Sequence, residues 1–198
     1  MRSRFDIPSV RFEDAKDKIR SGDLLSFHPC FVWYSPITWF TWLIAFSNTH
    51  RISHSAMACW WGDKLMCVQM QAGSDRIVLL SDYVRKWPGK IIVSKAKVPY
   101  GFNRRKAAAE MVAVTDKQYG WLRLLVLGFC NTFTGRWLYP NVSNDQAEIT
   151  KWPPVCSEAY SRIMRLNGFD PTPERPDCRT EPHHLYESQK MKPLFVLV

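Results

Sequence analysis

The apolar positions that follow Cys156 recur at helical spacing, and they predict a helix that buries one face. Asn167-Gly168 supplies the left-handed stop that typically ends such a helix, and Pro153-Pro154 keeps the chain extended before it. The apolar side chains of the buried face are Ala159, Tyr160, Ile163, Met164 and Leu166. The pattern therefore puts a cysteine in the first turn of a buried helix.

Short and alternating apolar runs predict strands elsewhere in the chain. Residues 52–61 form one such run, and the turn Gly62-Asp63 joins it to a second predicted strand at 64–71. Further short strands are predicted at 24–27, 76–80, 91–98 and 194–198. The two-residue turn between 52–61 and 64–71 is typical of antiparallel pairing.

Weaker helical patterns lie between and around the strands. Residues 12–20 predict a short polar helix, residues 81–84 a helical turn capped by Ser81, and residues 183–186 another short helix. Residues 170–182 hold four prolines and are expected to be irregular. Together these elements predict an α+β fold in which a small, mostly antiparallel sheet packs against helices.

An amphipathic helix is expected from Asn103 onward, with Ala107, Met111 and Val114 on its apolar face. Its first turn carries Arg104-Arg105-Lys106, which is the wrong sign of charge for the helix dipole. We interpret these three side chains as a solvated face, and the docking of an anion is the alternative.

Two apolar regions raise the question of membrane contact. Residues 29–50 contain no charged side chain, but their uninterrupted apolar part at 37–46 is about ten residues long, half of what a bilayer span needs. A helix in the core is our preferred interpretation, and an aromatic surface at 31–46 that touches lipid or lines an acyl groove stays open. Residues 119–139 predict a second buried helix, and 141–151 a polar loop.

The cysteine at a helix start is a candidate nucleophile. The unpaired N–H groups and the dipole of the first turn favour negative charge, so the pKa of Cys156 is expected below the value of about 8.5 for a free thiol. The alternative is a cysteine that only packs, because cysteine is among the most buried residue types.

His54 is the candidate general base. It lies near the start of the strand 52–61, on one face with Ala56, Ala58 and Trp60. On the next strand Cys67, Gln69 and Gln71 would share a face, and a glutamine there could hold the imidazole in one tautomer. Gln69 and Gln71 both qualify for that third position.

Composition narrows the class of protein. A chain of 198 residues with 46% hydrophobic and 23% charged residues is expected to fold as one domain, at 20–198, with an N-terminal extension at 1–19. The net charge of +9 favours anionic partners such as acidic polymers or lipid headgroups. The chain carries no nucleic-acid signature, no phosphate-binding glycine loop and no zinc-spaced cysteine pair, so we expect no nucleic-acid partner and no cofactor.

The cysteines and the N-terminus indicate the compartment. Three of the six cysteines lie in apolar stretches, so reduced thiols are expected. The first six residues are basic without an apolar segment behind them, so we expect no signal peptide and synthesis in a cytoplasm. A zinc site at Cys178, His183 and His184 is a weak alternative because it lacks a fourth ligand.

Five short blocks in this order resemble the circularly permuted NlpC-type papain-like proteins, in particular the YiiX-like group. The blocks are Gly22-Asp23-Leu24-Leu25-Ser26-Phe27, Ser53-His54-Ser55-Ala56-Met57, Tyr119-Gly120-Trp121, Cys156-Ser157-Glu158 and Thr180-Glu181-Pro182-His183-His184-Leu185. The resemblance implies a cysteine hydrolase or acyltransferase in which Cys156 attacks and His54 transfers the proton. It also implies an acidic third residue, where this chain has Gln69.

Three functions follow as hypotheses. The resemblance favours a cell-wall amidase or endopeptidase acting on an anionic polymer or peptide, delivered to the wall by some other means. Lecithin retinol acyltransferase-like proteins resemble the same permuted arrangement, so a lipid-directed thioesterase, phospholipase or acyltransferase is the second. The third is a degenerate structural protein, for example of a phage virion, and Gln69 in place of an acid is its main support.

Overall fold

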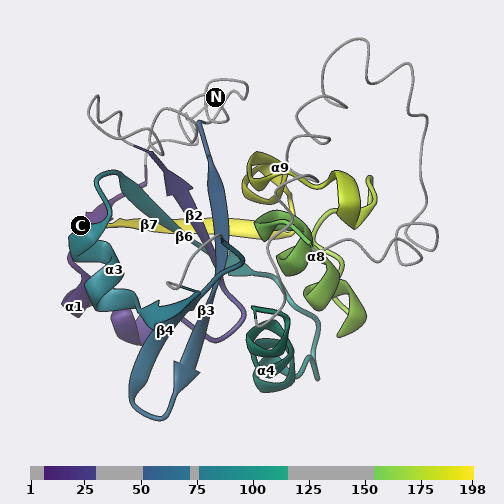
Figure 1. The fold of residues 1–198 in the computed structure, drawn as a ribbon, viewed down its shortest axis with the longest axis horizontal. Coiled ribbons are helices and arrows are strands. Elements are labelled where there is room, and N and C mark those ends of the chain that lie inside the picture. The colour runs from purple at the N-terminus through teal and green to yellow at the C-terminus, as the bar shows by residue number, and fades with distance from the viewer. Residues whose placement is uncertain (1–6, 30–50, 72–75, 116–153) are drawn as a thin grey trace.

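The protein folds as an α+β structure built on one seven-stranded sheet (Figure 1). This computed structural model describes residues 7–29, 51–71, 76–115 and 154–198. The strands are β1 (Ser9–Val10), β2 (Leu24–His28), β3 (His54–Trp61), β4 (Lys64–Val68), β5 (Ile77–Leu79), β6 (Lys90–Ala96) and β7 (Met191–Leu197). Their order in the sheet is β1-β7-β6-β2-β3-β4-β5. The predicted fold class is thereby confirmed at the level of α+β.

Antiparallel pairing dominates among the described strands, where only β1 runs parallel to its neighbour β7. β7 brings the C-terminal residues beside β6, so the sheet joins both ends of the described chain. Residues 9–10, which belong to the expected N-terminal extension, form the edge strand β1. The predicted hairpin of β3 and β4 is present, and Gly62 adopts φ +62° in its turn, a conformation that suits glycine.

Helices cover both faces of the sheet. α1 (Phe12–Ala15) and α3 (Leu80–Lys86) contribute to the core on one face. α4 (Arg104–Thr115), α8 (Cys156–Leu166) and α9 (Pro182–Glu187) pack on the other. Short 3-10 turns occupy Lys16–Lys18 and Asp177–Arg179. The predicted apolar regions 29–50 and 119–139 and the loop 141–151 lie outside the described residues, except for residue 29.

The strand β3 divides its side chains between the two cores, as its alternation predicts. Ala56 and Ala58 belong to the core under α1 and α3, whereas Met57 and Cys59 belong to the core under α4 and α8. The small residues that share a face with His54 thus make room for α3 and its neighbours, while the Cys156 helix packs on the opposite face.

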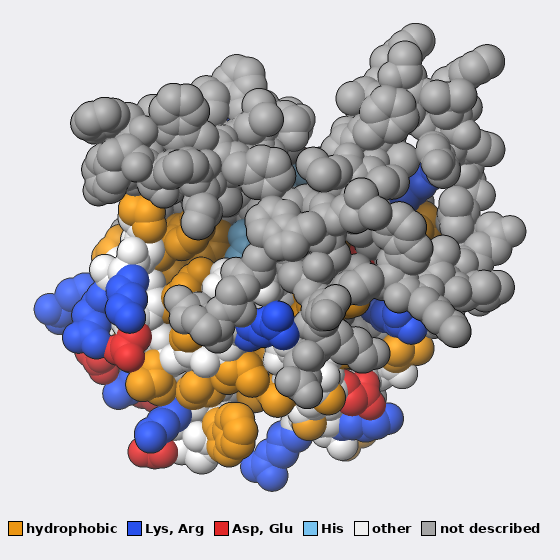
Figure 2. Space-filling model, viewed as in Figure 1, with side chains coloured by type: hydrophobic (Ala, Val, Ile, Leu, Met, Phe, Trp, Pro, Cys, Tyr) orange, Lys and Arg blue, Asp and Glu red, His pale blue; other side chains and the backbone are white. Residues whose placement is uncertain are grey.

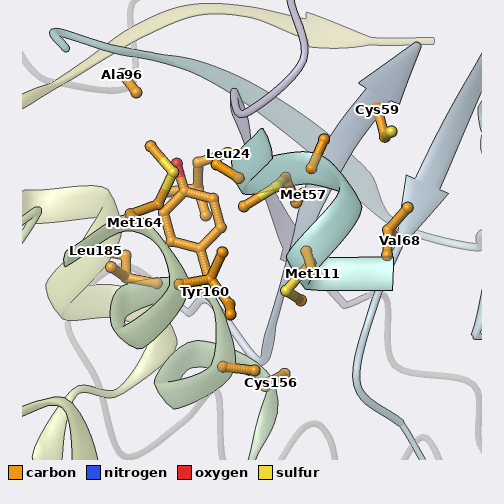
Figure 3. Packing of buried hydrophobic residues seen from close by; sticks show 14 of the residues in the cluster. Leu24, Met57, Cys59, Val68, Ala96, Met111, Cys156, Tyr160, Met164 and Leu185 are labelled. Carbon is orange, nitrogen blue, oxygen red and sulfur yellow. The ribbon is translucent and has the colours of Figure 1, made fainter. Parts of the chain in front are cut away.

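The helix α8 buries Ala159, Tyr160, Ile163 and Met164 of the predicted apolar face (Figure 3). The predicted burial of Leu166 is wrong, because this last residue of the helix is 53% exposed. Tyr160 and Met164 are fully buried, and the hydroxyl of Tyr160 donates a hydrogen bond of 2.9 Å to the carbonyl of Gly22. Gly168 adopts φ +90° just after the helix, which confirms the predicted left-handed stop. The position of Cys156 is therefore fixed by about three turns of packed helix behind it.

The solvated interpretation of the basic first turn of α4 is wrong for Arg104. Its guanidinium forms an ion pair of 3.0 Å with the fully buried Asp23 and donates to the carbonyls of Ser21 and Ala96. Arg105 is exposed, as expected. A buried carboxylate needs a paired charge, and the opposite sign on Arg104 outweighs its unfavourable position at the helix dipole.

Two predicted boundaries also need correction. Ser81 does not cap α3, because β5 leads directly into the helix and Leu79 takes the N-cap position without a side-chain hydrogen bond. The strand predicted at 64–71 ends at Val68, so Gln69 follows it. No helix in the described part of the chain is long and apolar enough to cross a membrane.

Candidate active site

Cys156 is the first residue of α8 and lies with its side chain almost fully buried, 4% exposed. Val155 precedes it in an extended conformation, with φ −89° and ψ 170°, and takes the N-cap position without a side-chain hydrogen bond. The N–H groups of the first turn are consequently not all used within the helix. Proline ahead of Cys156 keeps the chain extended, and the amphipathic helix begins at Cys156. The thiol therefore lies at the N-terminus of the helix.

His54 is the first residue of β3, at the end of the sheet where α8 begins. Its backbone pairs with Phe27 of β2, and the two rings pack with centroids 5.3 Å apart. Phe27 is in turn held by Tyr83 and Trp87, at ring distances of 5.4 and 5.2 Å. This aromatic support limits the orientations open to the imidazole.

Gln69 is the partner of the imidazole. Its side-chain oxygen Oε1 lies 2.8 Å from Nε2 of His54, and the residue is fully buried. The ladder of β3 and β4, continued beyond Met57 and Val68, would set Gln71 opposite His54 and Gln69 on the diagonal. Gln69, the residue on the diagonal, makes the hydrogen bond to His54, so Gln69 takes the third position and Gln71 does not.

The amide oxygen of Gln69 fixes the tautomer of His54. Because a carbonyl oxygen only accepts, the proton of the neutral ring is on Nε2. Nδ1 then carries the lone pair and is the nitrogen available to a thiol. Cys156 and His54 are within hydrogen-bond contact of each other, so the structure brings all three predicted site residues together.

The electrostatics of the site favour a thiolate and an imidazolium. Burial by itself raises the pKa of Cys156, but the charge of His54, its hydrogen bond and the backbone N–H groups of Ser55 and Ser157 lower it below its ordinary value. Burial likewise opposes the charged form of His54, and the Cys156 thiolate together with Gln69 raises the pKa of the imidazole. Each group thus stabilises the charge of the other.

The other buried cysteines have the opposite tendency. Burial raises the pKa of both Cys59 and Cys67. Cys59, Cys67, Cys156 and Cys178 form no disulfide with one another in the described ranges. Cys156 therefore differs from Cys59 and Cys67 in its charged partner and not in its burial.

The histidines near the C-terminus group with Glu181 and not with Cys178 as the zinc alternative expected. Ligand atoms of Glu181, His183 and His184 lie within 4.8 Å of one another. However, Nδ1 of His184 accepts the backbone N–H of Glu181 in a capping box, and the guanidinium of Arg175 lies 2.8 Å from its Nε2. A positive charge at that distance opposes a cation, so we assign no metal to this group.

Several residues around the thiol were not anticipated from the sequence. Phe27 under the imidazole and the N–H of Ser55 at the sulfur are long-range contacts without a sequence signal. Ser157, Ser161 and Arg165, in contrast, repeat every fourth residue along α8 and mark a polar stripe that the helical period would have revealed.

The fold and the site define an α+β protein with a buried Cys-His-Gln arrangement of the kind that suits nucleophilic catalysis. The chain matches no known family model, and no curated protein matches it significantly.

Proposed function

We propose that this protein is a cysteine hydrolase that cleaves an amide bond through Cys156, His54 and Gln69. One observation carries the proposal: the 2.8 Å hydrogen bond from Nε2 of His54 to Gln69 leaves Nδ1 for a thiol whose pKa is lowered in spite of burial. A structural cysteine in the same surroundings would gain nothing from an oriented imidazole. Perturbed pKa values at a nucleophile and base are typical of functional sites.

The chemistry proceeds through an acyl-enzyme. The Cys156 thiolate bonds to the carbonyl carbon, and N–H groups at the start of α8 hold the oxyanion. The C–N bond then breaks as the His54 imidazolium gives its proton to the leaving amine. Water attacks the thioester while His54 accepts its proton, and the acid product departs as the thiolate is restored.

A permuted papain-like arrangement is the fold relationship that we propose for this site. The chain order, with the histidine strand before the cysteine helix, and the antiparallel strands β2, β3 and β4 beside α8 support it. Gln69 stands where the resemblance implies an acid. A glutamine orients the imidazole but adds no charge to stabilise the imidazolium, so that charge depends on the Cys156 thiolate.

The substrate class that we propose is an anionic peptide of the bacterial cell wall. The net charge of +9 supports an anionic partner. On the face shown in Figure 2, Lys and Arg side chains lie at several separate places over the described residues. Such a distribution attracts an acidic polymer as a whole, and its effect would weaken with salt.

The test is turnover and capture of the acyl-enzyme. Wild-type protein and Cys156→Ser are incubated with peptidoglycan fragments, and with acyl-lipid vesicles as the alternative substrate, and products are followed by mass spectrometry. We expect new amine and acid ends from the peptide fragments and a transient acyl adduct on Cys156, both absent in the variant. Acyl transfer from the vesicles alone would replace the amide substrate by a lipid one, and no adduct on Cys156 from either source would refute the hydrolase.

A further inference from the structure

One face of α8 is polar although it is buried. Ser157 and Ser161 are 1% and 0% exposed, and Arg165, one turn further, is about three-quarters buried. This stripe lies apart from the apolar face of Tyr160 and Met164 that meets the sheet. It packs against the proline-containing segment 170–182, which leads into α9.

Each member of the stripe makes a hydrogen bond to that segment. The hydroxyl of Ser157 donates to the carbonyl of Thr180 at 2.6 Å. Ser161 and Arg165 both donate to the carboxylate of Asp177, each at 2.7 Å. Three successive turns of the helix are thereby tied to one segment of chain.

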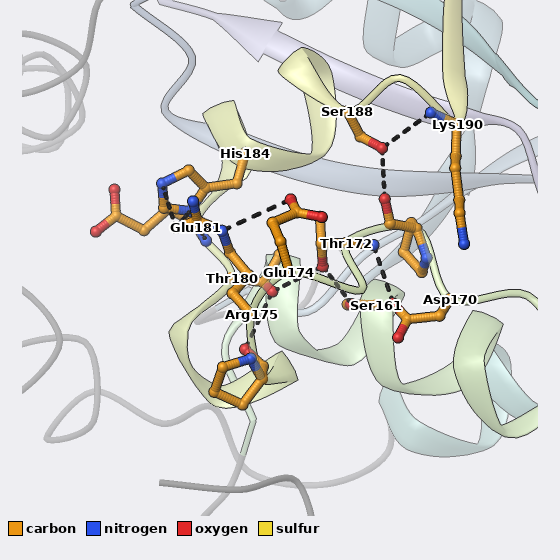
Figure 4. Close-up of polar contacts among 12 residues, drawn as sticks. Ser161, Asp170, Thr172, Glu174, Arg175, Thr180, Glu181, His184, Ser188 and Lys190 are labelled. Carbon is orange, nitrogen blue, oxygen red and sulfur yellow. Dashed lines mark hydrogen bonds and ion pairs between the residues drawn. The ribbon is translucent and has the colours of Figure 1, made fainter. Parts of the chain in front are cut away.

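The acceptor of the Ser157 hydroxyl is itself held in place (Figure 4). The side chain of Thr180 bonds the hydroxyl of Thr172 at 3.1 Å and the carbonyl of Pro176 at 3.2 Å. Thr172 and Thr180 are 0% and 1% exposed, so no water competes for these bonds. Thr180 therefore presents a rigid carbonyl to the first turn of α8.

The first turn is also where the thiol is stabilised. The backbone N–H of Ser157 is one of the two N–H groups that lower the pKa of Cys156. The same residue thus contacts the sulfur through its N–H and the fixed carbonyl of Thr180 through its hydroxyl. Anchoring the side chain fixes the direction of the peptide N–H, because both belong to one short residue.

We propose that Ser157 is a positioning residue, whose hydroxyl bond to Thr180 holds the first turn of α8 so that its N–H points at the Cys156 sulfur. The proposal rests on the nucleophilic role of Cys156. Ser161, one turn further along the same stripe, is equally buried and bonded but makes no contact with the thiol in the described structure. It serves as the matched control, because its loss affects the helix and not the sulfur.

The experiment measures how fast iodoacetamide labels Cys156 between about pH 5 and 9, a range that brackets free and activated thiols. Wild type, Ser157→Ala and Ser161→Ala are compared by peptide mass spectrometry, with a thermal melt of each. Ser157→Ala is expected to move the labelling profile to higher pH and to slow labelling at pH 6 by roughly tenfold, about the effect of one charge-assisted hydrogen bond. Ser161→Ala is expected to lower the melting temperature and leave the profile unchanged.

The outcomes separate the two proposals. A wild-type Cys156 that labels only at the pH of a free thiol would refute the hydrolase, and the role of Ser157 with it. A wild-type profile at low pH that Ser157→Ala leaves in place, or that Ser161→Ala moves equally, would refute the positioning role alone. If Ser157→Ala does not fold, Thr180→Val loosens the acceptor instead, and a shift in the same direction supports the proposal while an unchanged profile overturns it.

Discussion

Cys67 and Cys156 are both buried at the same sheet, yet the pKa of one thiol is raised and the pKa of the other is lowered. Cys67 is fully buried between Ala58 and Val78, on the face that α1 and α3 cover, and burial raises its pKa. Cys156 is 4% exposed, and its pKa is lowered by His54 and by two backbone N–H groups. Burial therefore does not distinguish a structural cysteine from a candidate nucleophile, and the polar groups around the sulfur do.

The difference extends to the two faces of the sheet. The core under α1 and α3 is apolar, with Phe27, Leu65 and Leu80 among its members. The face under α4 and α8 also carries the hydroxyls of Ser26, Ser55 and Ser94, which have no hydrogen-bond partner within the described residues. Apart from His54, which lies on the side of Ala56, the first face is thus mainly apolar and contributes stability, whereas the second also accepts the unfavourable burial of three hydroxyls.

Removing the imidazole should make Cys156 resemble Cys67 and is the largest effect that we expect. In His54→Ala the sulfur stays buried but loses the charge that lowers its pKa, so the pKa should rise above that of a free thiol. Labelling of Cys156 by iodoacetamide at pH 7 should slow by roughly 100-fold or more, as is typical for loss of a catalytic base. Mass spectrometry of the labelled peptide measures this rate.

A second histidine provides the control for this change. His28, at the end of β2, donates to the carbonyl of the next residue, and in the described part of the chain its ring makes no hydrogen bond with Cys156, His54 or Gln69. His28→Ala should keep the wild-type labelling profile. Equal loss of labelling in both variants would mean that the reactivity of Cys156 depends on the packing at this end of the sheet and not on the imidazole of His54.

The next effect concerns the residue that orients the imidazole. Gln69→Ala removes the acceptor for Nε2, so both tautomers become populated and labelling at pH 7 should fall by roughly tenfold, the equivalent of one buried hydrogen bond. Gln69→Glu keeps an acceptor and adds a negative charge. It should raise the pKa of His54 further, so that the imidazolium persists to higher pH.

The pH dependence of turnover distinguishes these two variants. The imidazolium is present below the raised pKa of His54 and is lost as pH rises through it. In Gln69→Glu the alkaline limb of the rate profile should therefore move to higher pH, and in Gln69→Ala to lower pH. An unchanged alkaline limb in both would show that Gln69 does not act on His54. Gln71→Ala is the matched control.

Substitution by serine should cost more stability at Cys67 than at Cys156, although Cys156 is expected to be the more reactive thiol. Cys67→Ser buries a hydroxyl in an apolar core, which costs about 1–3 kcal/mol and, for a chain of this size, roughly 2–4 °C of melting temperature for each kcal/mol. Cys156→Ser retains His54 and two N–H groups as partners and should melt within about 1 °C of wild type. Thermal melts of both variants test this, and a larger loss for Cys156→Ser would contradict it.

Local sequence patterns predicted most of the elements that carry the site. The helical spacing after Cys156 and the stop at Gly168 define α8 because both signals are local. The alternation along β3 likewise placed His54 at a strand start and on the face of Ala56. Local patterns were enough to bring the nucleophile and the base into one hypothesis.

Contacts between distant segments could not be predicted in the same way. The ion pair of Arg104 with Asp23 joins residues 81 positions apart, and no local pattern announces that a first-turn arginine is buried. The pairing of β1 with β7 joins the two ends of the chain. The selection of Gln69 over Gln71 depends on where β4 ends, and strand ends are set by neighbours more than by sequence.

The smallest effect that we expect is on stability, when a buried hydroxyl is removed from the sheet face that α4 and α8 cover. Ser94 is fully buried, and its hydroxyl has no partner among the described residues, so its desolvation is not compensated. Ser94→Ala should stabilise the fold by up to about 1 kcal/mol, because an alanine loses neither a hydrogen bond nor much packing. Ser161→Ala is the control, since that serine is equally buried but donates to Asp177, and it should destabilise. Denaturant unfolding of both variants measures the two changes in the free energy of unfolding. A destabilised Ser94→Ala would mean that the Ser94 hydroxyl has a hydrogen-bond partner, so that the two faces of the sheet would differ less in uncompensated polar burial.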